Sequence, residues 1–168
     1  MKKIVLAAAL AALASGAQAP AQAQTPQPAD WLTLHFSADL NKPADVAWER
    51  VGGNDWCAIA KYLDVKSCEV VSGKGELGSI RTINGTVVEN VVARTKYSYT
   101  YAQPFTPIFY HGTMEVVPVS ATTSRLVYTL IWNQNGYPDD KTRAEQREGR
   151  KVRFQAAVDK MAAAANAP

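Results

Sequence analysis

The sequence predicts an α+β domain in which a curved, seven-stranded antiparallel sheet wraps around a long C-terminal helix. Apolar and polar residues alternate over 31–40 and predict the first strand. Short β-branched and aromatic segments between turn residues predict six further strands between 65 and 134. An apolar stripe at helical spacing predicts a helix over 139–165. A sheet this long must cover one face, and only this helix is long enough to cover it.

Residues 1–23 have the parts of a secretory signal peptide: two lysines, a short apolar run and small residues at the exit. Cleavage is favoured after Ala23, because Pro20 makes the earlier Ala-Gln-Ala site a poor one. Residues 24–29 form a polar, proline-bearing leader predicted to be disordered, and residues 30–165 form a single domain. We therefore expect an exported protein, periplasmic or secreted. The apolar run is too short for a transmembrane segment, which needs ~20 residues.

The charge and the motifs exclude several classes of partner. The formal net charge falls from +3 to +1 when Lys2 and Lys3 leave with the signal peptide, so no nucleic-acid partner is expected. No glycine-rich phosphate loop and no metal-ligand spacing occur, so we expect neither a cofactor nor a metal. The two cysteines, Cys57 and Cys68, either form a disulfide after export or remain buried thiols. The sequence leaves that choice and the oligomeric state open.

Two short helices are predicted between the first and second strands. They cover 44–51 and 55–62, with a break at Gly52-Gly53. The second strand is predicted over 65–72, and the last strand over 123–134.

Four consecutive strands are predicted within 78–117, with turns at Asn84-Gly85, at 93–95 and in the proline-bearing segment 103–108. The third of these strands, predicted over 96–101, carries a tyrosine at every second position. The rings of Tyr97, Tyr99 and Tyr101 are therefore expected on one face, which we take to be the concave face.

Several motifs resemble the SRPBCC or START-like superfamily, whose members share the helix-grip fold. They are Ala44–Trp48, Gly78-x-x-Arg81 with Val88-Glu89, Tyr97–Tyr99 and Tyr110–Gly112. The resemblance covers residues 31–163 and implies the same fold. The superfamily includes polyketide cyclases, lipid-transfer domains and abscisic acid receptors, so the fold alone does not identify the function. A further run, Lys66–Cys68, resembles those receptors and implies that Lys66 faces the cavity.

The alternation of side chains along the strands and the helical spacing of apolar residues near the C-terminus predict a pocket between sheet and helix, with aromatic walls and a few polar groups. Such a lining is typical of small-molecule sites. The predicted ligand-binding residues are Lys66, which the resemblance implies, together with Arg81, Glu89, Tyr97, Tyr99, Tyr101, Tyr110, Met114, Tyr128, Trp132, Phe154 and Val158.

The polar groups have structural as well as chemical interpretations. Glu89 lies among valines, and a buried carboxylate needs a partner, for which Arg81 and Lys66 are the candidates. Glu89 and Arg81 then form a structural ion pair or act in proton transfer. Lys66 is equally interpreted as an edge-strand lysine that opposes aggregation.

The sequence thus supports three hypotheses. In the first, an exported protein holds a hydrophobic or aromatic ligand, lipid or polyketide-like, between sheet and helix. In the second, a cyclase or dehydratase-type enzyme uses Glu89, Arg81 or a pocket tyrosine. In the third, side chains fill the space, and a cavity below ~300 Å³ would favour this case.

Overall fold

The computed structural model describes residues 29–168. The predicted signal peptide and nearly all of the predicted leader lie outside the described residues. In chain order the elements are β1 (Trp31–Leu40), α1 (Ala44–Arg50), η1 (Ala58–Lys61, a 3₁₀ turn), β2 (Cys68–Ser72), β3 (Ile80–Ile83), β4 (Val87–Thr95), β5 (Ser98–Ala102), β6 (His111–Pro118), β7 (Ser124–Asn133), η2 (Gln134–Gly136, also 3₁₀) and α2 (Asp140–Asn166).

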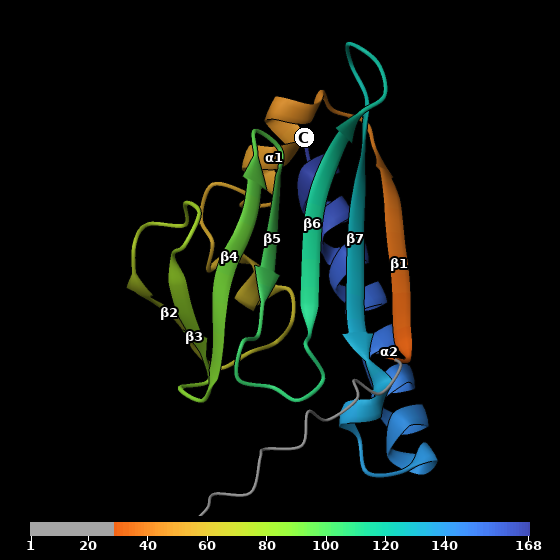
Figure 1. The fold of residues 1–168 in the computed structure, drawn as a ribbon. Coiled ribbons are helices and arrows are strands. Elements are labelled where there is room, and N and C mark those ends of the chain that lie inside the picture. The colour runs from red at the N-terminus through yellow and green to blue at the C-terminus, as the bar shows by residue number, and fades with distance from the viewer. Residues whose placement is uncertain (1–28) are drawn as a thin grey trace, which may run out of the picture.

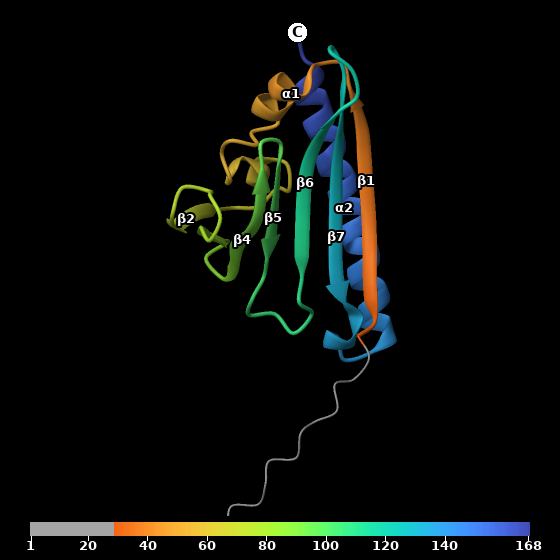
Figure 2. The same cartoon turned by 45° about the horizontal axis from the view of Figure 1, so that its top comes forward.

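The seven strands form one antiparallel sheet in the order β1-β7-β6-β5-β4-β3-β2. Figures 1 and 2 show α2 lying along one face of the sheet, next to β1 and β7, while the segment between α1 and β2 lies on the same face near β4 and β5. The predicted fold class, a curved seven-stranded sheet with a long C-terminal helix, is confirmed. In residues 29–168 no helix is both long and apolar enough to cross a membrane.

Strand β1 has the predicted bounds and the predicted faces. It pairs with β7 along its whole length, from Trp31 opposite Asn133 to Leu40 opposite Ser124. Phe36 is buried beneath the sheet, whereas the polar residues that alternate with the apolar ones are exposed. The alternation of apolar and polar residues therefore identifies the concave face correctly.

The prediction of a second short helix over 55–62 is wrong in extent, because only η1 is helical. The Asp55 carboxylate accepts a hydrogen bond from the amide of Cys57 at 2.9 Å, which fixes a turn. The carbonyl of Trp56 accepts a hydrogen bond from the Arg81 side chain. The Cys57 amide and the Trp56 carbonyl therefore both bond to side chains and do not take part in a regular helix. The first helix, α1, ends one residue before its predicted end.

Strand β2 begins at Cys68, three residues later than predicted. The amides of Lys66 and Ser67 donate to the Asn84 side-chain oxygen, at 2.9 and 3.2 Å, instead of to a neighbouring strand. The structure also decides the open question about the cysteines. Cys57 and Cys68 form a disulfide with a Cα–Cα distance of 5.6 Å, which joins the η1 segment to β2.

The turn predicted at 93–95 lies elsewhere. A β-bulge between Val91 and Ala93 shifts the register, and β4 continues to Thr95. The turn is formed by Lys96 and Tyr97, so the ring of Tyr97 leaves a turn and is half-buried. The turns predicted at Asn84-Gly85 and within 103–108 are confirmed.

The helix α2 has two different halves. Asp139 caps it by accepting a bond from the Thr142 amide at 2.7 Å. The first half is charged and mostly exposed, whereas the predicted apolar stripe of the second half is buried against the sheet. The buried residues of α2 are Phe154, Ala157, Val158, Met161 and Ala165.

Candidate functional site

A pocket of about 140 Å³ lies on the concave side, where the charged half of α2 faces β3, β4 and the η1 segment. Its apolar lining comes from η1 and the connection to β2, from the two ends of the β3–β4 turn, from α2 and from the aromatic wall. These residues are Ile59, Ala60, Leu63, Val65, Ile83, Val87, Tyr101, Tyr110 and Phe154. The aromatic wall is the row of rings formed by Tyr99, Tyr101, Tyr110 and Trp132, of which Tyr101 and Tyr110 reach the pocket. The polar lining consists of Arg81, Asn84, Glu89, Gln103, Arg150 and Arg153.

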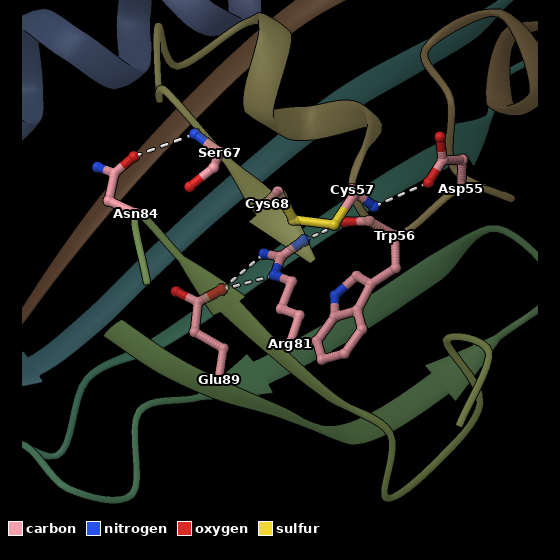
Figure 3. Close-up of a disulfide and its surroundings, with 8 residues drawn as sticks. All are labelled: Asp55, Trp56, Cys57, Ser67, Cys68, Arg81, Asn84 and Glu89. Atoms are coloured by element: carbon pink, nitrogen blue, oxygen red, sulfur yellow. Dashed lines mark hydrogen bonds and ion pairs between the residues drawn. A yellow bond between two sulfur atoms is a disulfide. The ribbon is translucent and has the colours of Figure 1, made fainter. Parts of the chain in front are cut away.

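The innermost polar groups form a buried ion pair. Arg81 on β3 and Glu89 on β4 lie directly opposite each other. Both side chains point to the concave side of the sheet and line the pocket. Arg81 donates to one carboxylate oxygen of Glu89 from Nε at 2.8 Å and from Nη2 at 2.7 Å. Gln103 donates to the other oxygen at 2.9 Å. Figure 3 shows the pair beside the disulfide. The predicted inward direction of both side chains is confirmed.

The guanidinium of Arg81 lies between two aromatic rings. It is 4.6 Å from the ring centroid of Trp56 and 5.1 Å from that of Tyr101. Burial disfavours its charged form, but the phenol of Tyr99 and the carboxylate of Glu89 act in the opposite direction, so the pKa of Arg81 is raised. Arg81 therefore stays charged and fixed in place.

The contacts of Glu89 limit what this carboxylate can do. Both of its oxygens accept hydrogen bonds from Arg81 and Gln103, and the residue is 5% exposed. A general base must reach its substrate's proton with an available oxygen. The geometry therefore favours the structural ion pair over proton transfer by Glu89.

Two tyrosines contribute phenols to the pocket wall. Burial raises the pKa of Tyr101 and of Tyr110, so both phenols remain protonated at neutral pH. The hydroxyl of Tyr101 is 3.1 Å from that of Tyr128. The ring of Tyr101 lies over Gly112, where a Cβ atom would come within 2.3 Å of it, so the glycine makes room for the ring. The phenols suit the role of hydrogen-bond donor and not of base.

Two cationic residues of the pocket, Arg150 and Arg153, were not predicted. Both lie on the charged half of α2. Arg150 precedes Phe154 by four residues and Arg153 precedes Ala157 by four, so each continues the buried face by one turn. That helical spacing is visible in the sequence, but charged residues surround both arginines, and such a mixture is typical of a solvated helix face.

The predicted ligand-binding residues fall into three groups. Arg81, Glu89, Tyr101, Tyr110 and Phe154 line the pocket. The core, including its partly buried edge, holds Tyr97, Tyr99, Met114, Tyr128, Trp132 and Val158.

Lys66 lies outside the pocket, so the cavity position implied for it is wrong. The side chain of Lys66 is exposed. The hydrogen bond from its amide to the Asn84 side chain fixes the segment that precedes β2. Lys66 is therefore outside the strand, and the alternation of strand side chains between the two faces does not apply to it.

At about 140 Å³ the pocket is smaller than the ~300–1,000 Å³ of ordinary ligand sites, and by this criterion the structure favours the third hypothesis, in which side chains fill most of the space between sheet and helix. The side chains of the aromatic wall occupy much of the expected space. Ring centroids along this wall are 6.3 Å apart for Tyr99 and Tyr101, 6.1 Å for Tyr101 and Tyr110, and 6.5 Å for Tyr110 and Trp132. The remaining volume is close to the ~150 Å³ that holds one benzene molecule. Within residues 29–168 no group of three His, Cys, Asp or Glu residues could hold a metal ion.

No protein-family profile matches the sequence. No curated protein matches it either. Solved structures do share its fold. The Zhui aromatase/cyclase from Streptomyces sp. R1128 superposes with a TM-score of 0.64 at 15% identity, over 80% of this chain and 93% of that one.

Two further structures extend this likeness. A truncated norcoclaurine synthase from Thalictrum flavum gives a TM-score of 0.59 at 14% identity, over 83% of this chain and 96% of that one. A protein from Nitrosospira multiformis gives 0.61 at 19% identity, over 79% and 94%. At such identities the likeness establishes the architecture, and the chemistry has to be argued from the pocket.

Proposed function

We propose that this chain, which has the helix-grip fold of the SRPBCC or START-like superfamily, binds a small hydrophobic or aromatic molecule between its sheet and its C-terminal helix. The observation that carries the proposal is the pocket itself. Aliphatic and aromatic side chains line it, and the fixed polar groups of Arg81, Glu89 and Gln103 lie at one side. An apolar site with a few oriented polar groups is the usual composition of a small-molecule site.

The volume limits the size of the ligand. About 140 Å³ accommodates one aromatic ring or a short chain. A lipid or a polyketide-like molecule would therefore place one ring or one end inside, unless the lining side chains move apart. Side chains fill the rest of the space between the sheet and α2, which favours this smaller ligand over a long lipid chain.

The enzyme hypothesis has weaker support. Two of the similar structures are an aromatase/cyclase and a synthase, which shows that this fold supports catalysis in those proteins. In this chain both oxygens of Glu89 accept hydrogen bonds, so a catalytic role for it requires one of these bonds, such as that from Gln103, to break. A Glu89→Gln variant that binds ligand normally but loses turnover of a polyketide-like substrate would favour the enzyme.

Export to an oxidising compartment belongs to the same proposal. The signal-like residues 1–23 support it, and so does the disulfide between Cys57 and Cys68. Disulfides persist in the periplasm and outside the cell, whereas thiols are kept reduced in the cytosol.

A thermal-shift screen of the mature protein against small aromatic and aliphatic compounds tests ligand binding. A compound at 100 times its Kd adds ~2.7 kcal/mol to the free energy of unfolding. We expect single-ring compounds to raise the Tm, and an Ala60→Leu variant, which fills the pocket, to lose that shift. The matched control Ala156→Leu lies on the exposed face of α2 and retains it. A screen with no shift in any compound would contradict the proposal.

A further inference from the structure

The basic side chains of α2 divide into two groups. Most of them form salt bridges with carboxylates: Lys141 with Glu145 at 3.9 Å, Arg143 with Asp140 at 3.1 Å, Arg147 with Glu148 at 3.6 Å, Lys151 with Glu148 at 3.8 Å and Lys160 with Asp64 at 2.9 Å. In the described part of the chain, Arg150 and Arg153 are the basic residues of α2 without a carboxylate partner. They are also the basic residues of α2 that line the pocket.

The partners of Arg150 are neutral. Its guanidinium is 4.9 Å from the ring centroid of Trp132, 5.3 Å from that of Tyr110 and 5.8 Å from that of Tyr137. It also donates to the side-chain oxygen of Gln146 at 2.9 Å. The rings fix the position of the charge without cancelling it. Arg150 is thus a held, half-buried cation that faces the pocket.

Arg153 supplies a second charge on the solvent side. It is exposed, and its guanidinium is 5.4 Å from the ring centroid of Phe154, which lines the pocket. Arg150 and Arg153 are three residues apart on α2, so they are neighbours on one side of the helix, and both line the pocket. The two cations therefore lie together at the mouth of the pocket.

The charges of the lining do not balance. Arg81 and Glu89 neutralise each other at the buried end. Arg150 and Arg153 then leave the pocket with an excess of two positive charges. Low-dielectric walls strengthen such a field and favour a ligand of opposite sign.

We propose that the pocket selects an amphipathic anion, whose apolar ring or chain lies inside and whose carboxylate is bound at the mouth by Arg150 and Arg153. Arginine suits this role because its planar fork donates two parallel hydrogen bonds to a carboxylate. The inference rests on the proposed function and specifies the class of ligand that the same pocket takes.

The test compares two probes of nearly equal size, 3-phenylpropanoate and 3-phenylpropan-1-ol. Both carry one ring, but only the acid is anionic at neutral pH. Calorimetric titration of the mature protein at low ionic strength is expected to give a Kd about tenfold lower for the acid, because hydrogen bonds to a charged group are stronger than neutral ones. Added salt is expected to reduce this preference.

Charge-removing variants assign the preference to residues. We expect Arg150→Gln to abolish most of it, Arg153→Gln to reduce it a few-fold and Arg150→Lys to retain part of it. In each variant the alcohol is expected to lose much less affinity than the acid, and an unchanged far-ultraviolet circular dichroism spectrum shows that the domain remains folded. The matched control Arg147→Gln removes an arginine of the same helix that lies outside the pocket and is expected to change neither affinity.

The possible outcomes separate this inference from the proposed function. Equal affinity for acid and alcohol would overturn the inference and leave the proposed function intact. A preference for the acid that survives the Arg150→Gln, Arg153→Gln double variant would also overturn it. Binding of neither probe would overturn the inference together with its premise.

Discussion

The concave side of the sheet consists of two halves that are built differently. In the closed half, β1 and β7 pack against the apolar half of α2, and Leu126, Leu130, Val158 and Met161 are fully buried. In the open half, residues of β3, β4, η1 and the charged half of α2 line the pocket. The apolar stripe of α2 begins at Phe154. The change in helix composition at this point determines where helix and sheet meet and where space remains.

The largest expected effect concerns the ion pair of the open half. Arg81→Met leaves the carboxylate of Glu89 buried without its cation, and we expect the free energy of unfolding to fall by ~3–5 kcal/mol. The double variant Arg81→Met, Glu89→Leu is expected to recover most of the loss. Urea unfolding followed by circular dichroism measures both.

An exposed pair provides the matched control. Arg125 and Asp39 lie across β7 and β1 at 2.7 Å, but their side chains are 51% and 79% exposed. We expect Arg125→Ala to change the free energy of unfolding by ~1 kcal/mol or less. Equal losses at Arg81 and Arg125 would contradict the structural importance of the buried pair.

Cavity formation distinguishes the closed half from the pocket wall. Leu130→Ala removes a fully buried side chain, and we expect a loss of ~2–5 kcal/mol in the free energy of unfolding with unchanged ligand affinity. Val87→Ala, in the half-buried wall of the pocket, is expected to cost less stability and to alter affinity instead. Chemical unfolding and calorimetric titration of both variants check this. The reverse pattern would remove the distinction between the two halves.

The disulfide is expected to matter mainly to the open half. A Cys57→Ser, Cys68→Ser variant loses the link between η1 and β2, and we expect the free energy of unfolding to fall by ~3 kcal/mol. Trp56 adjoins Cys57 and covers Arg81, so hydrogen exchange is expected to rise in η1 and β3 more than in β1 and β7. A uniform rise across the sheet would show that the link acts on the whole domain.

Glycine substitutions give the smallest expected effect. At Gly112 a methyl group would displace the ring of Tyr101, and we expect Gly112→Ala to cost ~1–3 kcal/mol. Gly149 has no atom near the position of its missing Cβ and lies in α2, so Gly149→Ala is expected to gain ~1 kcal/mol. Thermal unfolding compares the two. A stable Gly112→Ala variant with unchanged ligand binding would show that the aromatic wall is not fixed by this glycine.

Local patterns predict the elements whose packing is periodic. Strand β1 has the predicted bounds because a half-buried strand alternates strictly, and the buried stripe of α2 follows from helical spacing. The inward direction of the Arg81 and Glu89 side chains also follows from strand alternation, since the pairing of β3 with β4 keeps its register.

The errors arise where a distant contact overrides the local pattern. A bulge in β4 moves the turn to Lys96 and Tyr97, and no local residue pattern specified that bulge. The side chain of Asn84 delays β2 and leaves Lys66 exposed. Arg150 is held at the pocket by the rings of Tyr110, Trp132 and Tyr137, which come together only in the folded chain.

The most direct test of the account is a two-dimensional amide NMR titration of the mature protein with 3-phenylpropanoate. The account predicts that signals of the open half, including Glu89, Gln103 and Tyr110, shift in a saturable way, while those of Leu126 and Leu130 remain in place. Saturable shifts confined to the closed half, or none at millimolar concentrations of the acid, would contradict it.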